Sequence, residues 1–288
     1  MYKIAILGVE NSHADAFLKF VKEGHYPDIE IVGIYSDEPE AVKKLNEEFG
    51  VAIMDNYDSL AGKVDGIMVT ARHGDNHYKY AKPYIKYGIP MFIDKPTTCS
   101  DEEAVEFMNI VKEKGILLCG GSTCTSVKET KELAAAVKEN KLGILRGGSI
   151  ACPVFSDSPY GGFYFYAQHL VEIMTTVFGY DVKTVSARRT SNAVLFTANY
   201  DSYSVQGAFQ EKTGYYNVSV YGADNAESRC FTVVQDDFRV EMDDMLNILN
   251  GGKMRKSYEQ LAAPVFIMNT VLRAVESGKE EKIPEYKI

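Results

Sequence analysis

The sequence predicts an α/β fold in which a doubly wound parallel sheet is followed by an α+β domain with a mostly antiparallel sheet. Within residues 3–119, short apolar runs alternate with helical patterns, and strands that are apolar on both faces belong to a parallel sheet covered by helices. From residue 145 on, runs rich in Val, Thr, Tyr and Phe follow one another, which is typical of antiparallel pairing. A length of 288 residues suits two domains, which we expect at residues 1–120 and 121–288.

The N-terminal half contains six expected strands separated by helical patterns. Pro39 suits the first turn of a helix and Gly50 its C-terminal cap, and Ser100 is placed to cap a later helix. Right-handed crossovers between such strands give a nucleotide-binding domain of the Rossmann type. The expected strands are residues 3–7, 30–35, 51–54, 66–70, 91–94 and 116–119, and the expected helices are residues 14–22, 39–49, 78–87 and 101–114.

The C-terminal half begins with one more helix, continues with six strands and closes with an amphipathic helix. Short turn-like links, such as residues 211–214, join several of the strands. The expected strands are residues 145–150, 182–189, 194–200, 204–210, 216–221 and 230–234, and the expected helices are residues 126–139 and 257–277.

The composition argues against several classes of protein. The net charge of −9 is unlike that of a nucleic-acid-binding protein, which carries a basic face. No apolar run reaches the roughly 18–20 residues that cross a bilayer, and the apolar run at residues 4–8 is too short for a signal peptide. The five cysteines lack Cys-x-x-Cys spacing, which fits reduced thiols and no metal site. We therefore expect a cytoplasmic protein without nucleic-acid or membrane partners.

Ligands of open α/β sheets bind beyond the carboxyl ends of the strands, so the residues after each strand are the candidates. After the first strand, the dinucleotide fingerprint Gly-x-Gly-x-x-Gly retains only Gly8, with Glu10 and His13 at the later glycine positions. A carboxylate at the second position would repel the pyrophosphate that a glycine lets approach. Asn11 and Ser12 are expected to offer donors at the helix N-terminus. The alternative is that either one only caps the helix.

Ser36 and Asp37 follow the second strand. An acidic residue here usually accepts hydrogen bonds from the adenosine ribose, which suits Asp37 and NAD. Ser36 in that position would tolerate the 2′-phosphate of NADP. The choice between NAD and NADP stays open, as does the alternative that Asp37 is only an exposed loop acid.

Further candidates follow the fourth and fifth strands. Two histidines lie after the fourth strand, of which His77 is alternatively a simple helix-start residue. Lys95 follows the fifth strand, where its ammonium would point at the mouth of the sheet beside a bound nicotinamide. The expected cofactor-binding residues are Gly8, Asn11, Ser12, Ser36, Asp37, Thr70, Ala71, His73, His77, Asp94 and Lys95.

Asp94-Lys95-Pro96 resembles the Glu-Lys-Pro signature of the Gfo/Idh/MocA oxidoreductases, which are NAD(P)-dependent dehydrogenases of sugars, cyclitols and related polyols. Residues 71–77, followed by Ala81, are similar to the family's Thr-Pro-x-x-x-His element. Residues 257–259 and 274–283 resemble its C-terminal segment, so the similarity spans the chain. The resemblance implies NAD or NADP as cofactor, a sugar-like substrate oxidised at a CH–OH group, and a homodimer or homotetramer that uses the exposed sheet face of the second domain.

The family's second-domain motif, Gly-Gly-x-x-Asp-x-Gly-x-His-x-x-Asp, resembles residues 161–172, with His169 in place. The motif's first Asp is replaced here by Phe165, and its later Gly by Ala167. The resemblance implies that Lys95 hydrogen-bonds the substrate oxygen, while His169 accepts the hydroxyl proton as the hydride leaves.

The aromatic side chains beside His169 are candidates for binding the substrate. Because a phenol can hydrogen-bond a sugar hydroxyl, Tyr164 or Tyr166 would replace the missing carboxylate. The substrate-binding set is then Lys95, Tyr164, Tyr166 and His169. The alternative is that this aromatic stretch only packs.

Three functions are compatible with the sequence. The first is an NAD(P)-dependent dehydrogenase or reductase of a small hydroxy or carbonyl compound. The second is a catalytically degenerate family member that binds nucleotide or sugar as a sensor or partner subunit, which Glu10, His13 and Phe165 favour. The third is an enzyme that uses NAD transiently to cleave a glycosidic bond.

Overall fold

The computed structural model describes residues 1–288, and the chain divides into two compact units. The N-terminal unit contains Met1–Gly121, Val234–Ala262 and Ile288. The C-terminal unit contains Ser122–Val233 and Ala263–Lys287. The chain therefore leaves the first unit just after the expected boundary at Gly120-Gly121, and a later segment returns to it.

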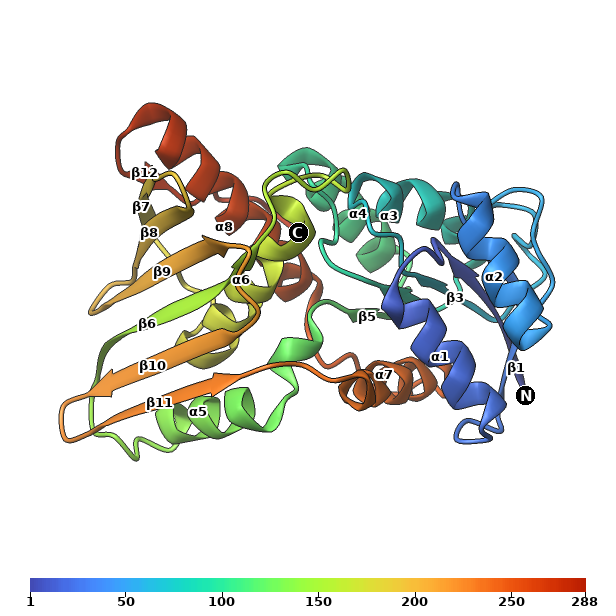
Figure 1. The fold of residues 1–288 in the computed structure, drawn as a ribbon, viewed down its shortest axis with the longest axis horizontal. Helices are drawn as coiled ribbons and strands as arrows, with labels where there is room; N and C mark the ends of the chain where they lie inside the picture. Colours follow the sequence, from blue (N-terminus) through green and yellow to red (C-terminus); the bar gives the residue numbers. More distant parts are fainter. The chain divides into compact units, whose positions relative to one another are not determined.

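The N-terminal unit is built on a five-stranded parallel sheet in the order β2-β1-β3-β4-β5 (Figure 1). The expected strand at residues 51–54 is wrong. This segment forms a single bridge, Ile53 to Ile34, beside the edge strand β2, and the Ile53 side chain is 51% exposed. Of the four residues only Met54 is buried, so the run lacks the apolar burial on both faces that is typical of a strand within a parallel sheet. The strands are β1 (Tyr2–Leu7), β2 (Ile29–Tyr35), β3 (Gly66–Val69), β4 (Met91–Ile93) and β5 (Leu118–Gly120).

The helix-end signals in the N-terminal unit are confirmed. Pro39 starts α2, Gly50 caps it at a φ of 72°, and the Ser100 hydroxyl accepts a hydrogen bond from the Glu103 N–H at the start of α4. The sequence analysis did not predict α7, which packs in one apolar cluster with α1 and β1 through Met242 and Met245. The helices are α1 (Ser12–Lys22), α2 (Pro39–Phe49), α3 (Asp75–Ala81) with the 3-10 turn η1 (Lys82–Tyr87), α4 (Asp101–Glu113), and α7 (Arg239–Leu249) after η3 (Gln235–Phe238).

The C-terminal unit contains a seven-stranded sheet in the order β11-β10-β6-β9-β8-β7-β12. All neighbouring strands are antiparallel except β6 and β9, so the predicted fold class is confirmed. The expected last strand at residues 230–234 begins earlier, at Ala226, and ends at Phe231. The strands are β6 (Leu145–Val154), β7 (Thr184–Arg189), β8 (Ala193–Asn199), β9 (Ser204–Glu211), β10 (Tyr216–Gly222), β11 (Ala226–Phe231) and β12 (Glu281–Lys282).

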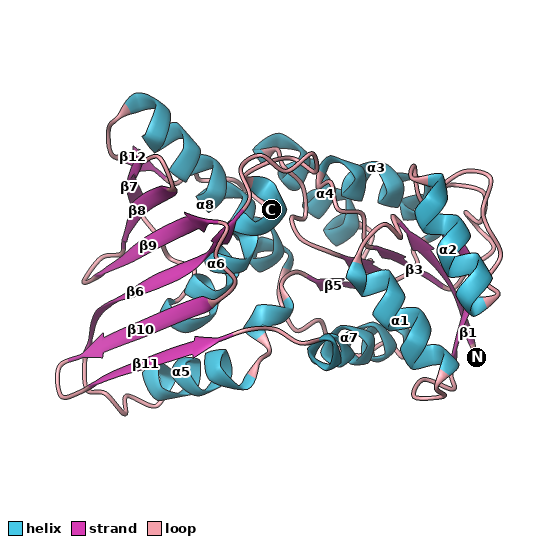
Figure 2. Cartoon of the chain, viewed as in Figure 1, coloured by secondary structure: helices cyan, strands magenta, loops and turns pink.

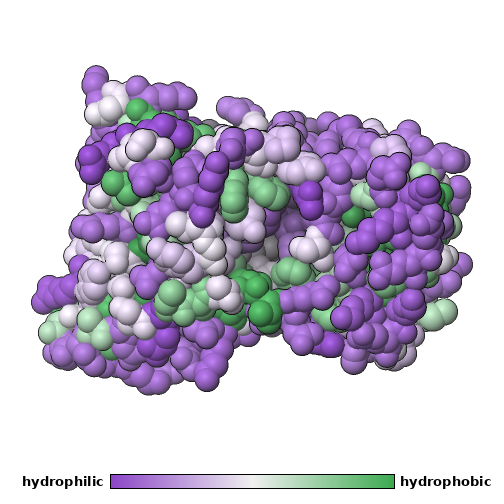
Figure 3. Space-filling view, viewed as in Figure 1, coloured by the Kyte–Doolittle hydropathy of each residue, from purple (hydrophilic) through white to green (hydrophobic).

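Helices cover one face of this second sheet (Figure 2). Its apolar residues pack with those of α5 (Lys128–Lys138), α6 (Tyr164–Phe178) and α8 (Tyr258–Ser277) in one cluster. A 3-10 turn, η2 (Thr123–Thr125), precedes α5. Hydrophilic side chains cover most of the face of each unit that Figure 3 shows. The longest apolar stretch on any helix falls short of what a membrane span requires.

Candidate functional site

The loop after β1 meets the loop after β3 at Gly8. Gly8 has a φ of 84°, and a Cβ added to it would lie 2.4 Å from the Cα of Ala71, so only glycine fits here. The Thr70 hydroxyl donates a hydrogen bond of 2.9 Å to the Gly8 carbonyl oxygen and holds the two loops together. In the order β2-β1-β3, the crevice between β1 and β3 is the point at which the sheet reverses its winding, where α/β proteins bind their ligands.

The alternative that Asn11 caps the first helix is what the structure shows. Its side-chain oxygen accepts hydrogen bonds from the backbone N–H groups of His13 and Ala14, at 2.8 and 3.3 Å. Its side-chain amide donates to the Thr70 carbonyl oxygen, so Asn11 also links α1 to the loop after β3. Ser12 is the first residue of α1, and its side chain is exposed.

The Glu10 carboxylate connects three strand ends. Its Oε2 accepts a hydrogen bond of 2.6 Å from the hydroxyl of Ser36, the residue directly after β2. Its Oε1 accepts one of 2.9 Å from the backbone N–H of Arg72, in the loop after β3. The carboxylate is therefore anchored at the end of β2, while Asn11 caps the N-terminus of α1.

Asp37 lies next to Ser36 but has different partners. Its carboxylate accepts hydrogen bonds from the hydroxyls of Tyr35 and Tyr80, at 2.6 and 2.7 Å. These two hydrogen bonds lower the pKa of Asp37 from its usual value. Asp37 is thus an exposed acid that organises a tyrosine cluster.

Asp94 and Lys95 are buried directly after β4, with 1% and 7% of their surface exposed. The Asp94 carboxylate accepts hydrogen bonds from the His13 ring at 2.8 Å, from the Asn11 amide at 3.4 Å and from the Lys95 backbone N–H at 2.7 Å. Burial alone would raise the pKa of Asp94, but the charges of His13 and Lys95 hold it below its usual range. The carboxylate therefore stays ionised beside the lysine.

His13 lies between two buried carboxylates. Its Nε2 is 3.9 Å from the carboxylate of Glu241 on α7, on the side opposite Asp94. Burial alone would lower the pKa of His13, but Asp94 and Glu241 raise it above its usual value. The ring of Phe238 packs edge-on at 4.3 Å between centroids and covers the imidazole.

The two histidines that were expected to bind the cofactor, His77 and His73, differ in burial. His77 is fully buried, and its ring nitrogens lie within hydrogen-bond distance of the carbonyl oxygens of Ala71 and Pro96. It thereby joins the loop after β3 to the Asp94-Lys95-Pro96 turn. His73 is partly exposed, and its Nδ1 accepts a hydrogen bond of 3.3 Å from the backbone N–H of Asp75.

In the C-terminal unit, His169 on α6 belongs to a buried polar group. Its Nδ1 is 2.6 Å from the hydroxyl of Ser122. The Ser122 backbone N–H donates to the carboxylate of Glu172 at 3.0 Å, and so does the side-chain amide of Gln168 at 2.5 Å. The Cys124 sulfur is 3.6 Å from the same Nδ1. These contacts fix the orientation of the imidazole ring.

Aromatic rings surround the start of α6. The Tyr166 ring packs edge-on against His169, at 5.0 Å between centroids, and against Phe165 at 5.2 Å. The Tyr164 hydroxyl donates a hydrogen bond of 2.5 Å to the side chain of Asn269 on α8. Tyr164 thus links two helices, whereas Tyr166 covers the imidazole.

The N-terminal sequence also matches a family model. Residues 2–121 match that of the Gfo/Idh/MocA family, described as an oxidoreductase family with an NAD-binding Rossmann fold. The N-terminal domain belongs to the Gfo/Idh/MocA family. For residues 2–121, the predicted family and the predicted NAD-binding type of fold are therefore confirmed. This Gfo/Idh/MocA domain carries the Gly8 loop and the Asp94-Lys95-Pro96 turn.

Solved structures extend the likeness in fold beyond the Gfo/Idh/MocA domain. Myo-inositol 2-dehydrogenase from Lactobacillus plantarum is 13% identical, with a TM-score of 0.86 over 98% of this chain and 99% of its own. Scyllo-inositol dehydrogenase from Lactobacillus casei, with bound NAD(H) and scyllo-inositol, is 13% identical, with a TM-score of 0.85 over 98% and 99%. A myo-inositol dehydrogenase from Corynebacterium glutamicum is 15% identical, with a TM-score of 0.83 over 99% of both chains. Comparison with curated protein sequences gives no significant match.

The sequence analysis missed several residues of the buried polar groups around Asp94 in the N-terminal unit and around His169 in the C-terminal unit. Ser122 comes shortly after β5, so the rule that selected Lys95 at the end of β4 would also have selected it. Glu10 and His13 were noted only as departures from the glycine fingerprint. No sequence signal points to Glu241, because it lies on α7, which the pattern analysis did not predict.

Proposed function

We propose that the chain is an NAD(P)-dependent oxidoreductase that acts on the CH–OH or carbonyl group of a small sugar, cyclitol or similar compound. The observation that carries this proposal is the buried Lys95 at the carboxyl end of β4, beside an ionised Asp94. A buried ammonium costs free energy unless it is compensated. Its position at the ligand-binding edge of a Rossmann sheet is the one that a catalytic cation needs.

The residues present fit a dinucleotide. Gly8 forms a close backbone crossing with Ala71 that a Cβ would fill, and Glu10 is anchored by Ser36 and the Arg72 N–H. The cofactor-binding residues proposed from the sequence in the loops after β1, β3 and β4, together with Ser36 after β2, remain the proposal. Asp37 is left out of this set, because its carboxylate accepts hydrogen bonds from Tyr35 and Tyr80. Within this set Asn11, Thr70 and His77 act by holding the loops in register.

The cofactor, when bound, supplies the hydride chemistry. The Lys95 ammonium donates a hydrogen bond to the substrate oxygen and stabilises the negative charge that grows there. His169 takes up the hydroxyl proton, because a neutral imidazole is a base suited to neutral pH. Its Nδ1 faces Ser122, so we assign the proton transfer to Nε2. Tyr166, which packs on this imidazole, is the stronger of the two tyrosine candidates for contacting the substrate.

Binding is tested first. The chain has 19 tyrosines and no tryptophan, so energy transfer from tyrosine to the nicotinamide of NADH or NADPH reports binding, and the melting temperature gives a second readout. Binding of neither cofactor at millimolar concentration would contradict the proposal.

The roles of the two residues are tested on any substrate that supports turnover. Lys95→Ala and His169→Ala should each lower turnover by at least about 10²-fold, the lower end for a general acid–base or charge-stabilising group. The matched controls are Lys138→Ala and His25→Ala, at exposed surface positions away from the residues assigned to the site. Wild-type rates in the Lys95 and His169 variants would contradict the assigned roles.

A second candidate function is a family member that binds nucleotide or sugar without catalysis. Phe165 favours it, because a phenyl ring that packs against Tyr160 and Tyr166 takes the position of the family's polar carboxylate. Such a protein would bind NADH in the titration, and its binding would be unaffected by His169→Ala. It would show no turnover on any cyclitol or sugar.

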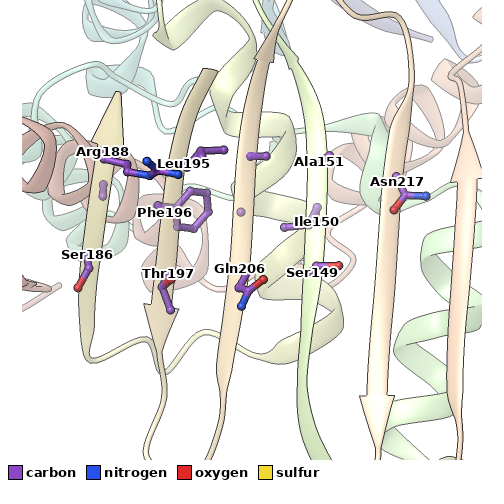
Figure 4. A pocket seen from close by; sticks show the side chains of 13 residues that line it. Ser149, Ile150, Ala151, Ser186, Arg188, Leu195, Phe196, Thr197, Gln206 and Asn217 are labelled. Carbon is purple, nitrogen blue, oxygen red and sulfur yellow. The ribbon is translucent and has the colours of Figure 1, made fainter. Parts of the chain in front are cut away.

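We also propose that the chain forms homodimers or homotetramers through the helix-free face of its second sheet. Figure 4 shows small and polar side chains, among them Ser149, Thr197 and Gln206, side by side on neighbouring strands that line a shallow hollow. The residues adjacent to them in sequence, such as Ala198 and Val205, point to the helix-covered core, so this hollow is on the opposite face. Light scattering that gives the monomer mass of 32.1 kDa would contradict this proposal.

A further inference from the structure

The structure separates the two carboxylates that are close to the end of β2. In Rossmann domains a carboxylate at this point accepts hydrogen bonds from the hydroxyls of the adenosine ribose. Asp37 has the expected position in the sequence, but both of its oxygens already accept hydrogen bonds from Tyr35 and Tyr80. The Lys79 ammonium lies 3.7 Å from the same carboxylate. Asp37 is thus held in a tyrosine cluster, and the neighbouring Lys79 ammonium offsets its negative charge.

Glu10 brings a second carboxylate to the same strand end from the loop after β1. Its Oε2 is 2.6 Å from the Ser36 hydroxyl and its Oε1 is 2.9 Å from the Arg72 backbone nitrogen. A carboxylate oxygen can accept two hydrogen bonds, so each oxygen retains one acceptor position. Two anchors from different loops hold the group in place before any ligand arrives, which reduces the entropy lost on binding.

We propose that Glu10, and not Asp37, accepts the hydroxyls of the adenosine ribose, and that it thereby selects NAD over NADP. A ribose diol donates hydrogen bonds to a carboxylate, and charge-assisted bonds of this kind are the strong ones. In NADP the 2′-hydroxyl donor is replaced by a phosphate that is mostly dianionic at neutral pH, so the same carboxylate repels it. The inference rests on the proposed function, because it requires that a dinucleotide binds the Gly8 loop.

The competing interpretation of Glu10 is that its carboxylate obstructs the pyrophosphate. The two interpretations predict opposite changes in cofactor binding when the charge of Glu10 is removed. If Glu10 binds the ribose, a neutral side chain weakens NADH binding. If Glu10 obstructs the phosphates, a neutral side chain strengthens the binding of NADH and NADPH alike.

The test is a titration of the full-length protein with NADH and NADPH, followed by energy transfer from tyrosine. Wild type should bind NADH at least about tenfold more tightly than NADPH, which corresponds to one charge-assisted hydrogen bond. Glu10→Gln keeps the size of the side chain and removes its charge. It should weaken NADH binding about tenfold and bring the NADH-to-NADPH preference close to one.

Three further variants complete the design. Ser36→Ala removes one anchor and retains the carboxylate, so it should reduce the preference by less than Glu10→Gln, and it remains informative if the Gln variant fails to fold. Glu38→Gln, an exposed acid at the next helix N-terminus, is the matched control and should leave the preference unchanged. Asp37→Asn tests the competing residue and should leave the preference unchanged as well.

Each outcome has a distinct meaning. A Glu10→Gln variant that binds NADH as tightly as wild type, or more tightly, overturns the inference, and so does a preference that only Asp37→Asn abolishes. Equal binding of NADH and NADPH by wild type overturns the inference and leaves the proposed function standing. Binding of neither cofactor overturns the proposed function itself.

Discussion

The buried ion cluster around His13 allows a prediction of both size and sign. His13 has 7% of its surface exposed, and its ring lies between Asp94 at 2.8 Å and Glu241 at 3.9 Å. The two carboxylates are 1% and 2% exposed. The raised pKa of His13 means that the imidazolium is favoured in the folded state, where it compensates two buried negative charges.

His13→Ala removes this cation and leaves both carboxylates buried. Breaking a buried ion pair by removal of one partner costs about 3–5 kcal/mol, so we expect the free energy of unfolding at pH 7 to fall by about this amount. His25→Ala is the matched control, because the His25 side chain is 43% exposed and its charged partners, Glu23 and Arg239, lie at the surface. We expect the control to change the free energy of unfolding by no more than about 0.5 kcal/mol.

The pH dependence of the wild type follows from the direction of the shift. A group whose folded-state pKa is raised contributes its full stabilisation below its unfolded pKa, about 6.5 for histidine. The contribution is lost as the pH rises through the raised pKa of folded His13. Asp94, with its lowered pKa, contributes above about pH 4 and loses its contribution only as the pH falls further. The cluster therefore stabilises the protein most between about pH 4 and 6.5.

Urea unfolding followed by far-ultraviolet circular dichroism, at several pH values from 5 to 9, measures these effects. A double-mutant cycle of His13→Ala with Asp94→Asn should give a coupling energy of at least about 1 kcal/mol, since the two side chains are in direct contact. The reasoning is refuted if His13→Ala costs less than about 1 kcal/mol at pH 7 or if the two substitutions are additive.

Two further predictions concern the loops that carry the site. Gly8→Ala should cost about 2–4 kcal/mol, because it adds the left-handed penalty of a non-glycine residue to a Cβ only 2.4 Å from Ala71. Gly24→Ala is the control: its φ is 78°, no atom lies within 4 Å of the added Cβ, and it should cost only the backbone penalty of about 1–2 kcal/mol. Urea unfolding that gives the same loss of stability for Gly8→Ala and Gly24→Ala would contradict this account. Ser122→Ala should lower kcat about threefold to tenfold, because it removes the hydrogen bond that orients His169, and this fold-change matches the free energy of one such bond. The KM for the cofactor should stay unchanged, and Ser122→Thr should restore part of the lost kcat. A change in KM alone would argue against this positioning role.

Most of the fold could be predicted from the sequence, because its signals are local. Alternating strand and helix patterns, Pro39 and Gly50 at the ends of α2, and Ser100 at the start of α4 act within a few residues of their position. Two of the failures have non-local causes. Residues 51–54 are apolar enough for a strand but lie beyond the edge of the sheet, where they form one bridge only. The helix α7 follows the second-domain strands in the sequence and packs on the first sheet through long-range contacts.

The candidate site was predictable where a single strand end identifies a residue, and misread where partners from distant segments decide its role. Lys95 needs only the end of β4 for its selection. Glu10 and His13, by contrast, were judged by the glycines that they replace, which suggested a damaged phosphate loop. Their partners change that judgement: Arg72 is 62 positions from Glu10, and Asp94 is 81 positions from His13. Each charged residue that replaces a glycine is therefore part of a compensated network, which is how a chain that has lost a fingerprint can retain the geometry that the fingerprint serves.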